Sequence, residues 1–529
     1  MPLISLQHLA QLSRDKSFLI RTSLSIVAMS VALSFVISTF TGDSAPAPAT
    51  IVEETGASEA INALPSTNWK PSSLAQWIYS IRTGLPATGE PSDYDLRTLT
   101  NEPLGYLEKY RQEFESDFPM LKLLYEGLHL EANTESIEAL LKYSEEERYR
   151  NEFIGDLYAH SSNFEKATEF YQAELSHYPN STYSARSAII AALWSGNRTV
   201  ARELITRPGA KQLFRFYDLM SFQADARAWG PLFFSSVKHD YRQIISVFCL
   251  PALFTGLVWF LILTNFWQFN RTRLAMSLAA VGLGMISTTL TLYAVMIQER
   301  SFGFTENPND TELYQLIFWV SGVGLREETL KLICFLPLAF WCARRKNDLE
   351  AFILAALVGL GFAIQENIGY FSDSLYEHAA LTRLLTANPL HFSLTGLVGF
   401  YAYRMIVRKF YGWEEFLAVY ILAVVLHGIY DAVLSIPGWE DYSILTIVFI
   451  AILIYRFFDP LKKMMDLQSQ RRRLSPLGIF VLGATTITCI VMIFSATFFD
   501  FRPALASFAA AVGSMIPQAF AYISRFRDL

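Results

Sequence analysis

Long apolar segments recur along this chain of 529 residues, and they constrain its fold more than any other feature. Residues 22–40 are apolar and follow Arg14, Lys16 and Arg21, and a helix of about 20 apolar residues crosses a bilayer. This segment lacks a small-residue cleavage site, so we predict a retained signal anchor. Further spans are predicted at residues 244–264, 274–297, 313–342, 349–371, 391–410, 415–436, 442–458, 477–498 and 503–522. The expected fold class is therefore all-α, a polytopic membrane helix bundle of about ten spans.

The composition agrees with a membrane protein and excludes other classes. Hydrophobic residues make up 52% of the chain and charged residues 17%, and the mean hydropathy of +0.27 is higher than soluble domains usually have. The four cysteines all lie in apolar segments, so no disulfide framework is expected. No basic run is interleaved with exposed aromatics, and the cluster 471–473 lies beside an apolar span. We therefore expect the lipid bilayer as a partner and no nucleic acid.

Charge also predicts how the chain is oriented. Nineteen Lys/Arg lie at the N-terminal end and in the regions near 265–273, 342–348, 404–413, 455–476 and 523–529. The short loops on the opposite side of the membrane hold only Arg300, Arg383 and Arg502. Cytoplasmic loops carry the excess of Lys and Arg in membrane proteins. Both termini are therefore predicted to be cytoplasmic and residues 41–240 extracytoplasmic, and the expected location is a bacterial inner membrane.

The pattern of composition divides the chain into four parts. Residues 1–40 form the cytoplasmic N-terminus and first span, and residues 41–69, rich in Ala, Pro, Ser, Thr and Glu, suit a flexible linker. Residues 70–240 are polar and their periodicity is helical, and residues 41–240 together hold 28 Asp/Glu against 18 Lys/Arg. Residues 241–529 form the polytopic membrane domain, whose functional core we expect at about 313–436.

A repeat pattern lies inside the predicted extracytoplasmic domain. Gly155, Tyr158, Ala167, Tyr171 and Pro179 are spaced as in one tetratricopeptide repeat, in which small residues let paired helices approach. A similar spacing follows at Ala192, Gly196, Ala201 and Ile205. The pattern predicts a TPR-like domain with a concave surface for a protein or peptide ligand, and an ordinary helical hairpin domain is the alternative.

Ionisable residues interrupt four consecutive spans. Each costs roughly 2.5–3.5 kcal/mol at the middle of a bilayer on insertion scales, so a function must require them. Glu327 and Lys331, four residues apart, can form an ion pair on one helix face, and His427 and Asp431 have the same spacing. The candidate catalytic residues are Glu327, Glu328, Lys331, Glu366, Asn367, His391, His427 and Asp431.

The chemistry that such a cluster supports is hydrolysis. A carboxylate shielded from bulk water can accept a proton from a water molecule, while imidazole and amide groups stabilise an oxyanion. Alternatively, Glu366, His391 and His427 could hold a divalent metal such as zinc that activates the water. The HExxH and GxSxG motifs are both absent from the sequence.

Two other function classes compete with a hydrolase. The same carboxylates and histidines could relay protons in a coupled transporter or channel, although the two halves of the chain show no inverted repeat. The chain could also be a membrane assembly scaffold whose outer domain recruits partners. A scaffold leaves the buried ionisable residues unexplained.

The order of the motifs resembles a known family. Glu327-Glu328-x-x-Lys331, Phe362-x-x-x-Glu366-Asn367, His391 and His427-x-x-x-Asp431 follow one another on successive spans. This order is similar to that of PrsW-type intramembrane proteases, relatives of the CPBP and CAAX-prenyl endopeptidase superfamily. The resemblance implies a peptide hydrolase, glutamic or metal-dependent, that cleaves a membrane protein. It also implies that the paired glutamates activate water and that the later motifs supply hydrogen-bond donors or metal ligands.

Overall fold

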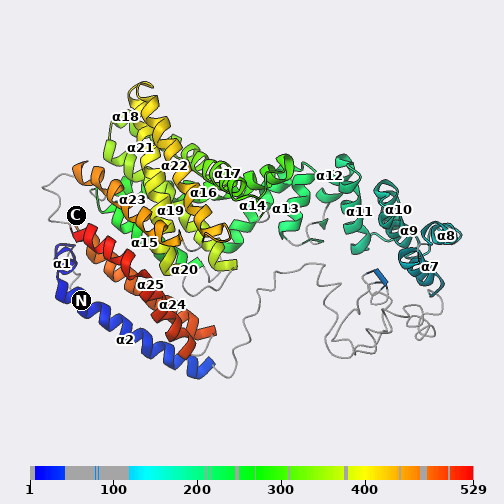
Figure 1. Ribbon diagram of the computed structural model, residues 1–529, viewed down its shortest axis with the longest axis horizontal. Helices are drawn as coiled ribbons and strands as arrows, with labels where there is room; N and C mark the ends of the chain where they lie inside the picture. The colour runs from blue at the N-terminus through cyan, green and yellow to red at the C-terminus, as the bar shows by residue number, and fades with distance from the viewer. Residues whose placement is uncertain are drawn as a thin grey trace. The chain divides into compact units, whose positions relative to one another are not determined.

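A computed structural model describes most of the chain, and its regular elements in these residues are all helical (Figure 1). The chain divides into two compact units, residues Val52–Ser235 and residues Met1–Ile51 with Ser236–Leu529. All but the first residue of the predicted linker 41–69 lies outside the described residues. The described residues are 6–41, 78, 81–82, 118–130, 132–207, 209–210, 213–214, 216–244, 249–267, 270–307, 310–373, 379–439, 442–464, 473–498 and 501–527.

The smaller unit is built from short helices that each pack against the next. They are α7 (Phe118–His129), α8 (Asn133–Leu140), α9 (Arg150–His160), α10 (Phe164–His177), α11 (Thr182–Trp194), α12 (Arg198–Thr206) and α13 (Phe216–Asp225). The side chains of Asn163, Ser181 and Asn197 cap the first turns of α10, α11 and α12. A Cβ atom on Gly155 would lie 2.6 Å from the ring of Tyr171, so glycine lets α9 and α10 pack closely. The TPR-like assignment itself stays a prediction.

A buried ion network holds α9 in this unit. Arg82 Nη2 lies 2.8 Å from Glu152 Oε1, and Arg82 Nε donates to Asp156 Oδ2 at 2.6 Å. The hydroxyls of Tyr171 and Tyr183 both donate to Asp156 Oδ1 at 2.8 Å. Every oxygen of Asp156 therefore has a partner, as a buried carboxylate requires.

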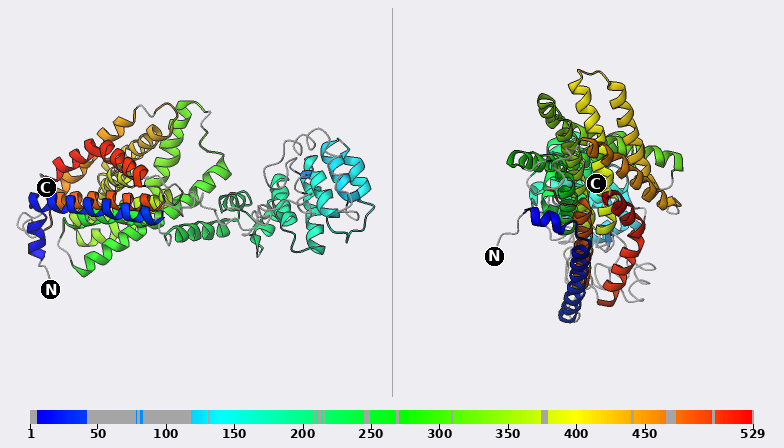
Figure 2. Two further views of the ribbon diagram at one scale, coloured as in Figure 1. Left: turned by 90° about the horizontal axis from the view of Figure 1, so that it is seen from below. Right: turned by 90° about the vertical axis from the view of Figure 1, so that its left-hand side faces the viewer.

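The larger unit is a bundle of longer helices (Figure 2). After α14 (Trp229–Ile244), which begins in the smaller unit, it contains α15 (Cys249–Thr264), α16 (Arg271–Phe302), α17 (Glu312–Ile317), the π-helical turn η3 (Phe318–Gly324), α18 (Leu325–Arg345), α19 (Asp348–Asp373), α20 (Ala379–Leu385), α21 (Ala387–Val407), α22 (Trp413–Ser435), α23 (Ser443–Met464), α24 (Pro476–Phe498) and α25 (Phe501–Arg527). The N-terminal helices α1 (Leu6–Leu12) and α2 (Lys16–Thr41) belong to the same unit, and α2 packs along α24.

Helix α19 lies at the centre of this bundle and packs against α15, α16, α18 and α21. Small residues allow its closest approach, because a Cβ atom on Gly284 of α16 would lie 2.0 Å from the backbone oxygen of Val358. A Cβ atom on Gly361 would lie equally close to the backbone oxygen of Val281. Helix packing in membranes commonly uses small residues in this way, because lipid offers no hydrophobic driving force between helices.

Six helices in the described part of the chain are long and apolar enough to cross a membrane, which supports a multi-pass membrane protein. A seventh is added if the bent pair α14 and α15 forms one span. Helix α18 also lies where a span is predicted, but its four ionisable residues at 326–331 make it too polar to be counted among these six. The count of about ten spans stays a prediction. The six ranges are Lys16–Thr39, Arg271–Phe302, Asp348–Phe371, Trp413–Ser435, Ile444–Met464 and Pro476–Ile493.

Candidate active site

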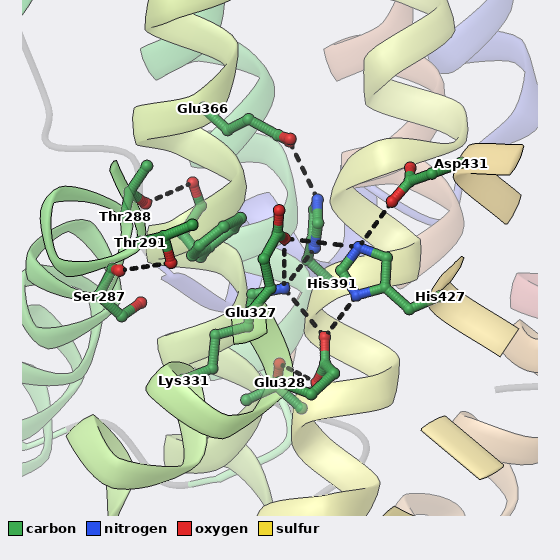
Figure 3. A network of polar contacts seen from close by, with 12 residues as sticks. Ser287, Thr288, Thr291, Glu327, Glu328, Lys331, Glu366, His391, His427 and Asp431 are labelled. Atoms are coloured by element: carbon green, nitrogen blue, oxygen red, sulfur yellow. Dashed lines mark hydrogen bonds and ion pairs between the residues drawn. The ribbon is translucent and has the colours of Figure 1, made fainter. Parts of the chain in front are cut away.

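The ionisable residues singled out in the sequence meet between four helices (Figure 3). Helix α18 carries Glu327, Glu328 and Lys331, and the other residues come from α19, α21 and α22. The predicted span 313–342 is not one regular helix, because the π-helical turn η3 separates α17 from α18 just before the paired glutamates. Such turns often occur at functional sites.

Lys331 forms the centre of the cluster. Its Nζ atom lies 3.3 Å from Glu327 Oε2 and 2.9 Å from Glu328 Oε1. The same ammonium lies 3.9 Å from the centre of the Phe362 ring, a cation–π contact. Since Lys331 and Glu328 are fully buried, each charge depends on the other for its stability in the membrane.

His427 lies between three carboxylates. Its Nδ1 atom is 2.8 Å from Glu328 Oε1, and a carboxylate only accepts, so Nδ1 carries a proton and donates it. Its Nε2 atom faces Glu327 Oε2 at 3.5 Å and Asp431 Oδ2 at 3.4 Å. The sequence spacing placed Asp431 on the same helix face as His427, but Glu328 makes the shorter contact.

His391 has a partner on each side of its ring. Lys331 Nζ donates to His391 Nδ1 at 2.9 Å, and this leaves Nε2 to donate to Glu366 Oε2 at 3.0 Å. The backbone oxygen of His391 would lie 2.3 Å from a Cβ atom on Gly359, so α19 and α21 touch directly beside the site. The rings of His391 and His427 are 5.0 Å apart between centroids.

Arg383 also belongs to the cluster, although its place in a short loop between predicted spans pointed only to the orientation of the chain. It lies on the short helix α20, where its Nη2 atom is 2.5 Å from Glu366 Oε2 and its Nε atom donates to Asn367 Oδ1. Asn367 in turn donates to Asn388 Oδ1 at 2.8 Å. The available signal in the sequence was a single Lys or Arg in a short loop on the side of the membrane where such residues are otherwise rare.

The site is accessible at one end. The side chains of Glu366 and Asp431 are 23% and 24% exposed, and that of Glu327 is 10% exposed. Glu328 is fully buried, and it also accepts a hydrogen bond from Thr395 Oγ1. Glu327 is therefore the member of the glutamate pair that a water molecule reaches more easily.

Three of these residues have the identities and spacing of a metal site. Candidate ligand atoms of Glu327, His391 and His427 lie within 4.8 Å of one another, and all three residues are buried. Glu328 holds the second nitrogen of His427, as carboxylates commonly do for metal-binding histidines. This set contains Glu327, whereas the sequence suggested Glu366, which lies 3.0 Å from His391 and pairs with Arg383.

The hydrogen bonds set one condition on metal binding. Lys331 donates to Nδ1 of His391, and Nε2 donates to Glu366, so this ring has no free lone pair. His427 Nε2 has no contact as short as these, since it faces Glu327 and Asp431 at 3.5 and 3.4 Å while Nδ1 bonds to Glu328. The residues fit a divalent cation in type and spacing, and binding requires Lys331 to release His391.

The fold and the site are those of a multi-pass helical membrane protein with a cluster of carboxylates and histidines buried among its helices. Comparison with known proteins shows which family this chain is similar to. Residues 272–455 match the model of the PrsW family, described as intramembrane metalloproteases, and this region contains all eight residues predicted from the sequence.

A weaker similarity connects the chain to a curated relative. "Protease PrsW" from Oceanobacillus iheyensis is 24% identical over 131 residues, which are 25% of this chain and 60% of that protein. No solved structure matches the chain. The smaller unit lies outside the region that matches the family model.

Proposed function

We propose that this protein is an intramembrane endopeptidase that hydrolyses a peptide bond of a membrane protein. One observation carries the proposal: Glu327, Glu328, Lys331, His391 and His427, which are far apart in the sequence, are all buried and lie within hydrogen-bond or ion-pair distance of a neighbour in the cluster. Ionisable groups that converge inside a membrane usually carry chemistry or move ions. The similarity to the PrsW family favours the chemistry of proteolysis over ion transport or scaffolding.

In the proposed mechanism Glu327 is the general base. Its carboxylate accepts a proton from a water molecule, and the water oxygen attacks the carbonyl carbon of the scissile bond. The proton moves to His427 Nε2, 3.5 Å away, which donates it to the leaving nitrogen as the carbon–nitrogen bond breaks. Glu328 holds the ring of His427 in place, and the positive charge of Lys331, whose ammonium is held by His391, stabilises the negative charge of the intermediate.

A metal is the alternative source of the nucleophile. A divalent ion such as zinc, held by Glu327, His391 and His427, would supply a bound water that is nucleophilic at neutral pH. Glu366 is 3.0 Å from His391, and Arg383 and Asn367 surround it. These three residues support His391, and Asp431 supports His427 at 3.4 Å.

The predicted orientation suggests where the substrate is cut. With both termini cytoplasmic, α19 runs outward, and Glu366 lies seven residues before the helix ends at Asp373. Asp431 lies four residues before the end of α22, which runs in the same direction. We therefore propose a first cut near the extracytoplasmic face, on the side where residues 41–240 could present a substrate or bind a peptide partner.

A tethered single-span reporter tests the activity. Wild-type protein in proteoliposomes should cleave it, and Glu327→Gln or Glu328→Gln should reduce the rate by about 100-fold or more, because a lost acid–base group typically costs this much. Glu414→Gln, which changes an exposed carboxylate at the start of α22, is the control. Full activity in both glutamate variants would contradict the mechanism.

Mapping the cleaved bond by mass spectrometry tests the proposed side. The expected cut lies in the outer half of the reporter span or just outside it. A cut in the cytoplasmic half or in the cytoplasmic tail would show that the orientation or the depth of the site is wrong.

A further inference from the structure

Two glycines bring the two halves of the candidate site into direct backbone contact. Gly428 follows His427 on α22, and a Cβ atom there would lie 2.4 Å from Val320 Cα and 2.7 Å from the backbone oxygen of Trp319. Gly324 closes the π-helical turn η3, and a Cβ atom there would lie 2.5 Å from the backbone oxygen of Val424. The contact is reciprocal, and both sides consist of backbone atoms that no side-chain rotation can move.

The turn η3 is also confined on its other side. A Cβ atom on Gly322 would lie 2.9 Å from the ring of Phe304 and 3.1 Å from Gln298 Nε2. Gln298 itself accepts a hydrogen bond from Arg326, the residue just before Glu327. The turn therefore has little room to move away from α22, because the end of α16 and the segment after it lie behind it.

The sequence connects this contact to the site over short distances. Gly324 precedes Glu327 by three residues and Glu328 by four, and Gly428 is adjacent to His427. The separation of the two backbones at this contact therefore sets the distance between Glu328 and His427, which is 2.8 Å. A methyl group added to either glycine would push the two backbones apart and lengthen that hydrogen bond.

We infer that Gly324 and Gly428 are positioning residues, which hold η3 against α22 so that Glu328 orients His427 beside Glu327. This inference rests on the proposed peptidase function for its kinetic consequence, but its geometric content is independent of that function. Ordinary van der Waals contact begins at about 3.4 Å, so the 2.4 Å approach at Gly428 leaves no room for a methyl group unless the helices separate by roughly 1 Å.

The test compares Gly428→Ala and Gly324→Ala with a matched control, Gly282→Ala. Gly282 lies in α16, and no atom outside its own stretch of helix lies within 4 Å of the place that a Cβ atom would take, so the same change there has no steric consequence. A displacement of about 1 Å at a catalytic group costs about 100-fold in rate, so we expect each site variant to lose about 100-fold in kcat with little change in KM. Gly282→Ala should keep the wild-type values.

A second measurement is independent of activity. The ¹⁵N spectrum of histidine-labelled protein, assigned by subtracting the spectrum of His427→Gln, should show His427 protonated at Nδ1 in the wild type and in Gly282→Ala. This signature should be lost in Gly428→Ala and Gly324→Ala. If the wild type cleaves no reporter, the proposed function fails while this spectrum still decides the inference.

Three results would overturn the positioning role. Wild-type kcat in both site variants would do so, and so would an unchanged His427 signal in both. Loss of folding in both variants, measured as the unfolding midpoint in detergent, would show that the contact holds the bundle together instead of aligning the site. Fall of kcat with a retained midpoint and an altered His427 signal is the result that supports the inference.

Discussion

Lys331 is the residue on which the charge balance of the site depends. It is fully buried, and its ammonium contacts two carboxylates and His391. Removing one partner of a buried ion pair typically costs about 3–5 kcal/mol, because the remaining charge is left without compensation. A metal ion would bring positive charge to the same carboxylate and the same histidine. The ammonium and a metal therefore compete for His391.

Zinc binding gives a prediction at the scale of single residues. Adding zinc to chelator-treated protein should raise the unfolding midpoint of the wild type, by the equivalent of about 2.7 kcal/mol when zinc is at 100 times its Kd. The rise should be lost in His427→Gln, because the imidazole of His427 supplies one of the three candidate ligand atoms.

The control for this prediction is His177→Gln, which changes an exposed histidine at the end of α10 and should keep the full rise. Absence of any zinc-dependent shift in the wild type would exclude the metal site at these concentrations. Water activation by Glu327 alone would then be the remaining mechanism.

Among the elements, α9 contains a feature that depends on pH. Asp156 is buried beside Arg82 and Glu152, and burial raises the pKa of its carboxyl above the ordinary value of 3.8, although Arg82 and the two tyrosine hydroxyls oppose this shift. A folded-state pKa above the unfolded value means that the folded state binds the proton more strongly. The stability from this group is therefore full below about pH 4 and falls as the pH rises through the higher, folded-state pKa.

Hydrogen exchange checks this expectation at the level of helices. Protection factors for the amides of α9, α10 and α11 should be lower at pH 8 than at pH 5 in the wild type, and Asp156→Asn should reduce this difference. Glu165→Gln removes an exposed carboxylate of α10 and should leave the difference as it is. The same pH dependence in wild type and Asp156→Asn would show that another group is responsible.

The topology is a property of the whole molecule, and cysteine labelling tests it. The natural cysteines are all buried, so introduced ones should report with little background. In intact cells, Glu147→Cys in the smaller unit should react with an impermeant maleimide, and Ser469→Cys in the basic region 455–476 should not. Both positions should react after the cells are opened. Labelling of Ser469→Cys alone in intact cells would mean that the orientation is reversed.

The sequence by itself determined which residues are candidates for the site and where most of the helices lie. Apolar segments form helices in a membrane because every backbone polar group must be satisfied within the chain, so the predicted segments can be read locally. Ionisable residues within those segments are costly, which made Glu327, Lys331, His391 and His427 recognisable without any contact being known.

Only the tertiary structure decided which of these residues touch. Glu328 and His427 are 99 residues apart, and their hydrogen bond depends on how η3 and α22 pack, which no local pattern encodes. The same is true of Arg383, whose loop position concealed its pairing with Glu366, and of Glu327 in place of Glu366 beside the two histidines. Periodicity and hydropathy describe one segment at a time, whereas the site arises from distances between segments, and those distances are set by packing of side chains and glycines across helices.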